Sequence, residues 1–216
     1  MHIRERYPTM QPFVGRRFAE SAGPRLLLVG ESHYLPAGST QHLDPATGYS
    51  GTATSLDDEE VLWISTARVV RGACDSGFRN RAHWIWKNAF EAINEAGPRY
   101  QRYVQVAEDV AFYNFFQRPA LQGESLEPTA RDVAVANAVF EDTMRMLSPG
   151  AVAFISRRAW WNFEEKTTVP VPVAATAHPT SPYWNRQCKR YGGRTGKQVL
   201  MDFVRDLAWP SPRLGT

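Results

Sequence analysis

A short polar run near the amino terminus holds four types of side chain that often take part in catalysis. A carboxylate, a hydroxyl, an imidazole and a phenol follow a glycine directly, in the order Gly30, Glu31, Ser32, His33 and Tyr34. The four residues before them, 26–29, are all apolar, which predicts a strand that is buried on both faces. Ligands of open α/β sheets bind at the carboxyl ends of the strands. The polar run is therefore predicted to lie in a ligand-binding crevice.

A single asparagine interrupts a second apolar stretch. Asn114 lies within residues 110–116, which are otherwise apolar and also predict a buried strand. An amide inside such a strand costs free energy unless it is paired. Asn114 therefore either bonds to neighbouring backbone or faces a ligand that has donors and acceptors of its own.

A histidine follows the last predicted strand. His178 comes two residues after the end of the stretch 169–176 and directly before Pro179. It is either a structural histidine or part of a site, and the same two interpretations apply to His33. Because the carboxyl ends of parallel strands meet at one edge of a sheet, we expect Glu31, Asn114 and His178 to line one pocket.

The remaining pattern alternates strands with helices, which predicts an α/β fold. We expect a three-layer α/β/α sandwich around a four-stranded, mostly parallel sheet, in one domain spanning 1–216 with an amino-terminal arm and helix in 1–24. The predicted strands are 25–29, 110–116, 151–155 and 169–176. The predicted helices are 11–21, one that begins at Thr54 or Ser55 and continues through Val70, and then 81–95, 100–108, 128–147, 157–165 and 195–207.

Charge is unevenly distributed along the 216 residues, although the net charge is only +3. No acidic residue occurs between Glu165 and Asp202. That interval contains six cationic residues, which are Lys166, Arg186, Lys189, Arg190, Arg194 and Lys197. Such a segment attracts phosphates independently of nucleotide sequence. An acidic run at 57–60 has a simpler explanation, because it fits the first turn of a helix.

The cysteine content and the amino terminus exclude several classes of protein. Cys74 and Cys188 are far apart and too few for a four-thiolate cluster or a zinc ribbon, so we expect free thiols, no metal and no cofactor. Residues 1–17 have no apolar core of a signal peptide, and no apolar run approaches the ~20 residues of a membrane span. We expect a cytoplasmic monomer that does not contact membranes.

These motifs, in this order, resemble those of the uracil-DNA glycosylase superfamily. That superfamily has a first motif of the type Gly-Gln-Asp-Pro-Tyr or Gly-Glu-Ala-Pro-Gly, an Asn in a middle strand, and a His-Pro-Ser-Pro motif after the last strand. Gly30 and Glu31 match the second form of the first motif, and Tyr34 matches the first form. The last motif is matched with one insertion, by the residues His178, Pro179, Thr180, Ser181 and Pro182.

The resemblance implies a role for each matched residue. Glu31, Ser32 and His178 would be catalytic, and Gly30, Tyr34 and Asn114 would bind the base. The DNA contacts would come from Pro179, Ser181, Tyr183, Trp184, Arg186, Lys189 and Arg190. Tyr183 and Trp184 would either wedge into a duplex or pack onto the end of the sheet. The implied partners are DNA, single-stranded or damaged, and a nucleobase.

The sequence also departs from the superfamily pattern, which leaves three hypotheses besides that of an α/β domain with an unrelated small ligand. Ser32 stands where the best-known members have a catalytic Asp, and His33 replaces a Pro. The protein is then a glycosylase that uses Glu31, or a module of the same fold that binds a nucleobase or nucleic acid without cleavage. The third hypothesis rests on Gly30-Glu31-Ser32-His33, which also resembles the short motif of erythromycin-esterase-like and haem-binding proteins.

Overall fold

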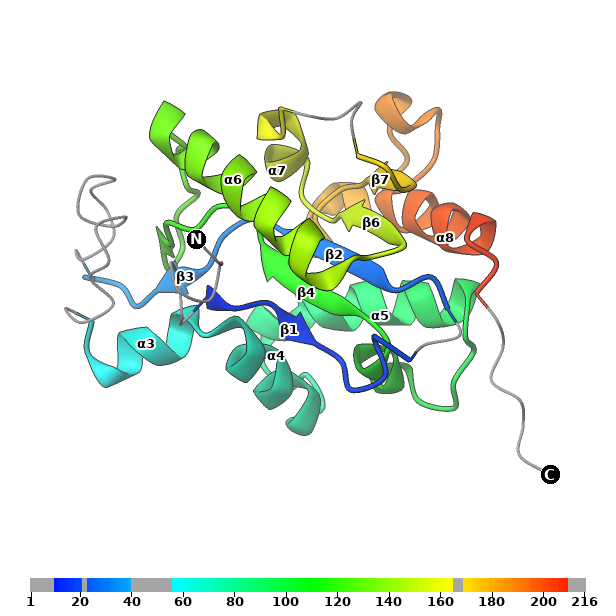
Figure 1. The fold of residues 1–216 in the computed structure, drawn as a ribbon, viewed down its shortest axis with the longest axis horizontal. Coiled ribbons are helices and arrows are strands. Elements are labelled where there is room, and N and C mark those ends of the chain that lie inside the picture. Colours follow the sequence, from blue (N-terminus) through cyan, green and yellow to red (C-terminus); the bar gives the residue numbers. More distant parts are fainter. Residues whose placement is uncertain (1–9, 21–22, 40–55, 165–168, 210–216) are drawn as a thin grey trace.

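The computed structural model describes residues 10–20, 23–39, 56–164 and 169–209, and a mostly parallel five-stranded sheet lies at its centre (Figure 1). The strands are ordered β1-β4-β2-β6-β7, and all pairs except β1–β4 are parallel. Their bounds are β1 Phe13–Val14, β2 Leu26–Gly30, β4 Ala111–Asn114, β6 Ala151–Phe154 and β7 Val173–Ala175. The chain therefore has a mixed α/β architecture.

The strand β1 replaces a predicted helix. We expected a helix over residues 11–21 and a sheet of four strands, and both expectations are wrong at this point. Phe13 pairs with Phe112 and Val14 with Ala111 in an antiparallel ladder. Gly15, the next residue, packs tightly against the chain. A Cβ at this position would lie 2.2 Å from the carbonyl oxygen of Ala107. A fifth, edge strand is therefore built from a segment whose partner is about a hundred residues away.

A second, two-stranded sheet extends the exits of β2 and β4. β3 (Tyr34–Leu35) pairs in parallel with β5 (Ala120–Leu121). The backbone N–H of Ala120 donates to the carbonyl of His33 at 2.9 Å. The polar run after β2 is thus held beside the segment that follows β4.

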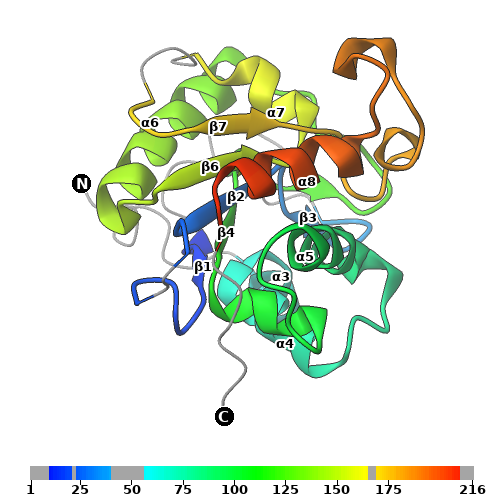
Figure 2. The same ribbon diagram turned by 90° about the vertical axis from the view of Figure 1, so that its right-hand side faces the viewer.

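Helices cover both faces of the large sheet (Figure 2). Alternate residues of β2 point to opposite faces, as strand geometry requires. Leu27 and Val29 pack with α6 and α7, whereas Leu26 and Leu28 pack with α4, α5 and α8. The helix bounds are α3 Asp58–Ile64, α4 Thr66–Asp75, α5 Trp84–Ala96, α6 Ala130–Leu147, α7 Arg157–Asn162 and α8 Gly196–Asp206.

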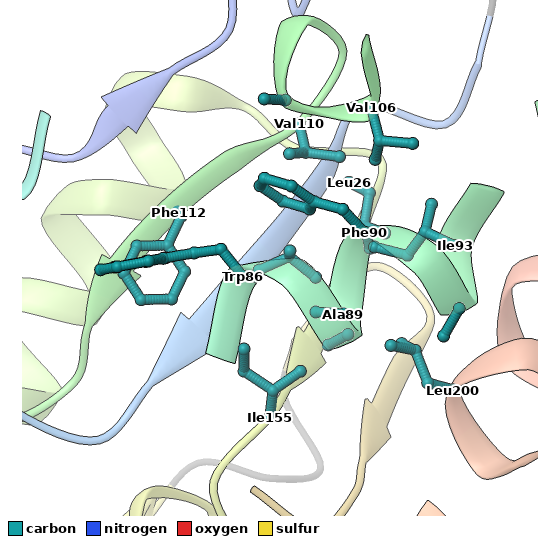
Figure 3. Close-up of a cluster of buried hydrophobic side chains, with 14 of the residues drawn as sticks. Leu26, Trp86, Ala89, Phe90, Ile93, Val106, Val110, Phe112, Ile155 and Leu200 are labelled. Atoms are coloured by element: carbon teal, nitrogen blue, oxygen red, sulfur yellow. The ribbon is translucent and has the colours of Figure 1, made fainter. Parts of the chain in front are cut away.

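The core between α5 and the sheet is rich in aromatic rings (Figure 3). Phe90 of α5 is fully buried, and Trp86 meets Phe112 of β4 edge to face at 5.5 Å between ring centroids. Such pairs stabilise a core by more than the area they bury. This packing fixes the amino-terminal end of α5 against the sheet.

Several helix boundaries differ from the predicted ones. The helix expected to start at Thr54 or Ser55 is capped by Asp57, and Ser65 divides it into α3 and α4; positions 54 and 55 lie outside the described residues. The segment 100–108 is a 3-10 helix over Tyr103–Glu108. Within the described part of the chain, no helix is both long and apolar enough to cross a bilayer.

Candidate functional site

The exits of β2 and β4 lie side by side. Gly30 and Asn114 are register partners at the ends of these parallel strands. Beyond them the backbones stay together, because the N–H of Phe115 donates to the carbonyl of Gly30 at 3.2 Å and that of Phe116 to the carbonyl of Glu31 at 2.9 Å. The polar run and the interior asparagine therefore meet at one point on the carboxyl rim of the sheet.

Glycine at position 30 allows Asn114 to lie against the strand. A Cβ built on Gly30 would be 2.3 Å from Oδ1 of Asn114 and 2.8 Å from the ring of Phe112. Real Cβ atoms do not approach other heavy atoms that closely, so any larger residue would displace the amide. A glycine is thus required at position 30 because the side chain of Asn114, the residue predicted to bind the base, packs against it.

The side-chain amide of Asn114 has no hydrogen-bond partner among the described residues. Its residue is 7% exposed, and no hydrogen bond from its side chain to any described residue occurs. The backbone carbonyl of Asn114, by contrast, accepts from Nε2 of Gln117 at 2.8 Å. Of the two interpretations, pairing with neighbouring backbone therefore does not hold within the described chain. Oδ1 and Nδ2 of Asn114 are not among the fully enclosed atoms without a partner, so the amide reaches the surface of the rim. Its donors and acceptor are therefore open to a ligand that has donors and acceptors of its own.

Two residues that the sequence analysis did not single out hold Glu31. Oγ of Ser156 donates to Oε2 of Glu31 at 2.8 Å and accepts the N–H of Ala159 at 3.2 Å, which caps α7. Nε of Arg158 lies 3.8 Å from Oε1 of Glu31. Ser156 lies two residues after the end of β6, so its position close to a strand end was the signal that would have found it.

The other side chains of the polar run differ in exposure. Ser32 is buried at 9% exposure, whereas Tyr34 is exposed. Burial raises the pKa of Tyr34, the negative charge of Glu31 raises it further, and Arg158 opposes both. Tyr34 is thus close enough to feel the Glu31–Arg158 pair, and its phenol stays protonated at neutral pH.

His33 has a structural role. Its Nε2 lies 2.8 Å from Oγ1 of Thr66, the first residue of α4, and the residue is 6% exposed. Burial lowers the pKa of His33 to about 4, and a backbone hydrogen bond with Trp63 only partly opposes this. The ring is therefore neutral at pH 7 and joins the rim to the helical layer. The haem-binding or esterase-like hypothesis relies on His33 as a functional side chain. The burial of this ring and its contact with Thr66 do not favour that role.

The buried His33 is expected to make stability depend on pH. Its pKa is about 4 in the folded chain and near 6.5 when unfolded, so the unfolded chain binds more protons between these values. The neutral His33 therefore contributes about 3 kcal/mol to the free energy of unfolding. This contribution is fully present above pH 6.5 and is lost as the pH falls through 4. Urea unfolding should show that the free energy of unfolding decreases by about 3 kcal/mol less between pH 7 and 4 in His33→Gln than in the parent. Equal slopes in the two proteins would contradict this assignment.

His178 is held as a neutral donor on the same rim. Burial lowers the pKa of His178 to about 4. The backbone N–H of Thr180 lies 3.3 Å from Nδ1, and Oγ1 of Thr180 lies 2.8 Å from it. Because an amide N–H can only donate, Nδ1 accepts and the ring proton resides on Nε2. Nε2 has no hydrogen-bond partner among the described residues and can donate to a ligand.

The loop that follows His178 contacts α5 and places the two predicted wedge residues, Tyr183 and Trp184, in different environments. The carbonyl of Pro179 accepts from Nδ2 of Asn88 at 2.8 Å, and Oγ of Ser181 is buried without a partner in the described chain. Tyr183 is exposed, but Trp184 is 2% exposed and belongs to the core beside α8. The predicted DNA contact of Trp184 is therefore wrong, because its ring is enclosed.

The basic side chains have two kinds of environment. Arg186, Lys189 and Arg190 are exposed after β7, where a phosphate can reach them. Arg118, by contrast, is buried and makes a two-pronged contact with the fully buried Asp132 at 2.9 and 2.7 Å. This ion pair fixes the exit of β4 to α6 and is structural.

A pocket of about 530 Å³ lies at the opposite end of the sheet. It is lined by residues that precede strands, such as Arg25 before β2, Pro149 before β6 and Val171 before β7. None of the predicted site residues lines it. This pocket is therefore separate from the candidate site on the carboxyl rim.

A carboxylate, an unpartnered amide and a neutral imidazole thus occur at the carboxyl ends of parallel strands. Glu31 and Asn114 lie at the ends of the neighbouring strands β2 and β4, whereas His178 follows β7, which is separated from β2 by β6. Among the described residues no hydrogen bond or ion pair joins His178 to Glu31 or Asn114. No protein-family model matches the sequence, and no curated protein matches it.

Proposed function

We propose that the protein binds a nucleobase of DNA at the carboxyl rim and excises it by hydrolysis of the N-glycosidic bond. The observation that carries the proposal is the unpartnered amide of Asn114, in a residue that is only 7% exposed, at the strand end next to the carboxylate of Glu31 that Ser156 holds. An amide offers one acceptor and two donors, which fit the hydrogen-bonding edge of a pyrimidine. Such a base has to leave the stack to reach a pocket, as it does in enzymes that modify bases.

Each group has a part in the proposed reaction. The bond between C1′ of the sugar and the base nitrogen breaks, and the base leaves with both electrons. Nε2–H of His178 donates to the base carbonyl, where negative charge develops. Glu31 stabilises the positive charge on the sugar or orients the water, whose hydroxide adds to C1′ while its proton leaves to the base.

The neutral imidazole suits this role. A low pKa keeps His178 uncharged at pH 7, and the contact from the N–H of Thr180 keeps the proton on Nε2. A donor that is already oriented costs no reorganisation when charge develops. Tyr34 at the mouth can pack against the base.

Ser32 favours a second candidate function, a binding module of the same fold. A hydroxyl carries no negative charge, and Ser32 is largely enclosed at the position that holds Asp in the glycosylases this sequence resembles. The site would then hold a base through Asn114 and His178 without cleaving it. Weak excision and binding without excision are the two outcomes to separate.

The separating experiment uses oligonucleotides with uracil, hypoxanthine, xanthine or mismatches, single-stranded and duplex. We expect the parent to give slow release of a base, revealed as alkali-labile abasic sites. Ser32→Asp should speed release by about a hundredfold, since one well-placed electrostatic group contributes that much. If neither protein releases any base while the parent binds the oligonucleotides, the binding module is the function.

A further inference from the structure

Exposed aromatic rings gather at the carboxyl rim. The most exposed large apolar side chains of the described chain are Tyr34, Trp84, Trp161 and Tyr183. Tyr34, Trp161 and Tyr183 follow β2, β6 and β7, respectively. Trp84 begins α5, one turn before the residue whose amide reaches the carbonyl of Pro179. Exposed apolar surface concentrated in one region is typical of an interaction site.

Trp161 is contacted by two arginines. It lies on α7 and is 55% exposed. The guanidinium carbon of Arg157 lies 5.4 Å from its ring centroid, and that of Arg190 lies 5.1 Å away. Arg157 also lies 5.5 Å from the ring of Tyr191. These cation–π contacts join α7 to the loop between β7 and α8 that carries Arg190. The loop is drawn in orange at the upper right of Figure 2.

The two arginines at Trp161 lack carboxylate partners. Among the described residues, neither Arg157 nor Arg190 forms an ion pair, whereas Arg158 lies beside Glu31 and Arg194 pairs with Asp202 at 3.1 Å. Two like charges on one indole repel each other. An anion that binds between or beside them would relieve that repulsion, so the cluster is electrostatically suited to a negatively charged partner.

We propose that Trp161, Arg157 and Arg190 form a platform that stacks an unpaired base of single-stranded DNA and binds its phosphate. An anion alone would satisfy the arginines, whereas a partner with flat rings can also pack against the exposed part of the indole. Proteins that bind single strands combine these two features, aromatic rings for the bases and cations for the backbone. An acidic peptide supplies only the charge.

The platform is connected to the candidate site through one residue. Ser156 caps α7 and donates to Glu31, so the helix that carries Trp161 starts at the carboxylate. The choice of DNA as the strand rests on the proposed function, and the platform would hold a nucleotide that neighbours the one in the site.

The test is binding of a fluorescein-labelled oligothymidine, measured by anisotropy over a salt series. Trp161→Ala should weaken binding by about tenfold or more, while Trp161→Phe keeps most of the affinity because a ring remains. The second probe is an oligomer of equal length that lacks all bases, on which Trp161→Ala should have little effect. Arg157→Ala with Arg190→Ala should weaken both probes and flatten the salt dependence. Arg145→Ala is the control, an exposed arginine at the other end of the sheet.

Three results would overturn the platform. The first is unchanged oligothymidine binding in Trp161→Ala, and the second is an equal loss of binding to both probes, which would mean that no base stacks. The third is polyglutamate binding as tight as that of oligothymidine, which would assign the cluster to an acidic protein. Base release is assayed separately, so a platform without excision and excision without a platform are distinguishable results.

Discussion

Replacement of Arg118 by methionine is expected to lower the free energy of unfolding by about 3–5 kcal/mol. The side chain of Asp132 is fully buried and receives two hydrogen bonds from Arg118, so the variant leaves a carboxylate in the core without its countercharge. Asp132 also accepts from the N–H and hydroxyl of Thr129 at the start of α6, but hydrogen bonds from neutral groups do not replace the charge of the guanidinium. Urea unfolding at pH 7 would show a lower midpoint at an unchanged slope.

An exposed ion pair of the same kind is the matched control. Arg145 bonds to Asp142 at 2.8 Å, but its side chain is 73% exposed. Arg145→Met should change stability by less than about 1 kcal/mol, because water already screens this pair. Adding Asp132→Asn to Arg118→Met should recover part of the loss, since the buried group is then neutral. A single Arg118→Met variant as stable as the control would refute the structural role of this pair.

Glu31→Gln is expected to reduce base release by about a hundredfold to a thousandfold. The amide keeps the size of the carboxylate and still accepts from Oγ of Ser156, but it carries no negative charge toward the sugar. Because that charge acts chiefly in the transition state, binding of the uncleaved oligonucleotide should stay within about threefold. Single-turnover rates and anisotropy on one oligonucleotide measure the two quantities.

Glu127→Gln provides the control for this substitution. Glu127 is the other carboxylate near Arg158, at 3.4 Å, and its side chain is 86% exposed. Its neutralisation changes the same arginine's surroundings without touching Glu31, so base release should stay near the parental rate. Equal rates for Glu31→Gln and the parent would remove Glu31 from the proposed reaction.

The sequence predicted the parallel strands and most helices because their signals are local. Residues 26–29 are apolar without interruption, and α6 and α8 begin at capping threonines, Thr129 and Thr195. β1 has no such signal. Its two residues are extended because they pair with Phe112 and Ala111, and that pairing depends on a chain segment far away in the sequence.

The site was predictable to the extent that strand ends carry polar residues. That rule selected Glu31 and His178 as candidates, and Ser156 obeys it as well. Asn114 was selected as the one polar residue in an apolar stretch. Arg158 and the ring of Trp161 were not foreseeable, because their contacts depend on how α7 is placed against neighbouring segments. Trp184 shows the converse, since the sequence does not tell which of two adjacent aromatic residues turns inward.

The outer strand β7 affects how the protein behaves at high concentration. Each edge of a sheet presents backbone groups that another chain can pair with, which leads to association of sheets. β7 is only three residues long, and Pro170 and Pro172 precede it. Proline has no N–H to offer to an incoming strand. The β7 edge of the sheet is therefore short, and the prolines before it offer no N–H to another chain. Both features disfavour fibrous aggregation, and they do so without the need for a helix that covers the edge.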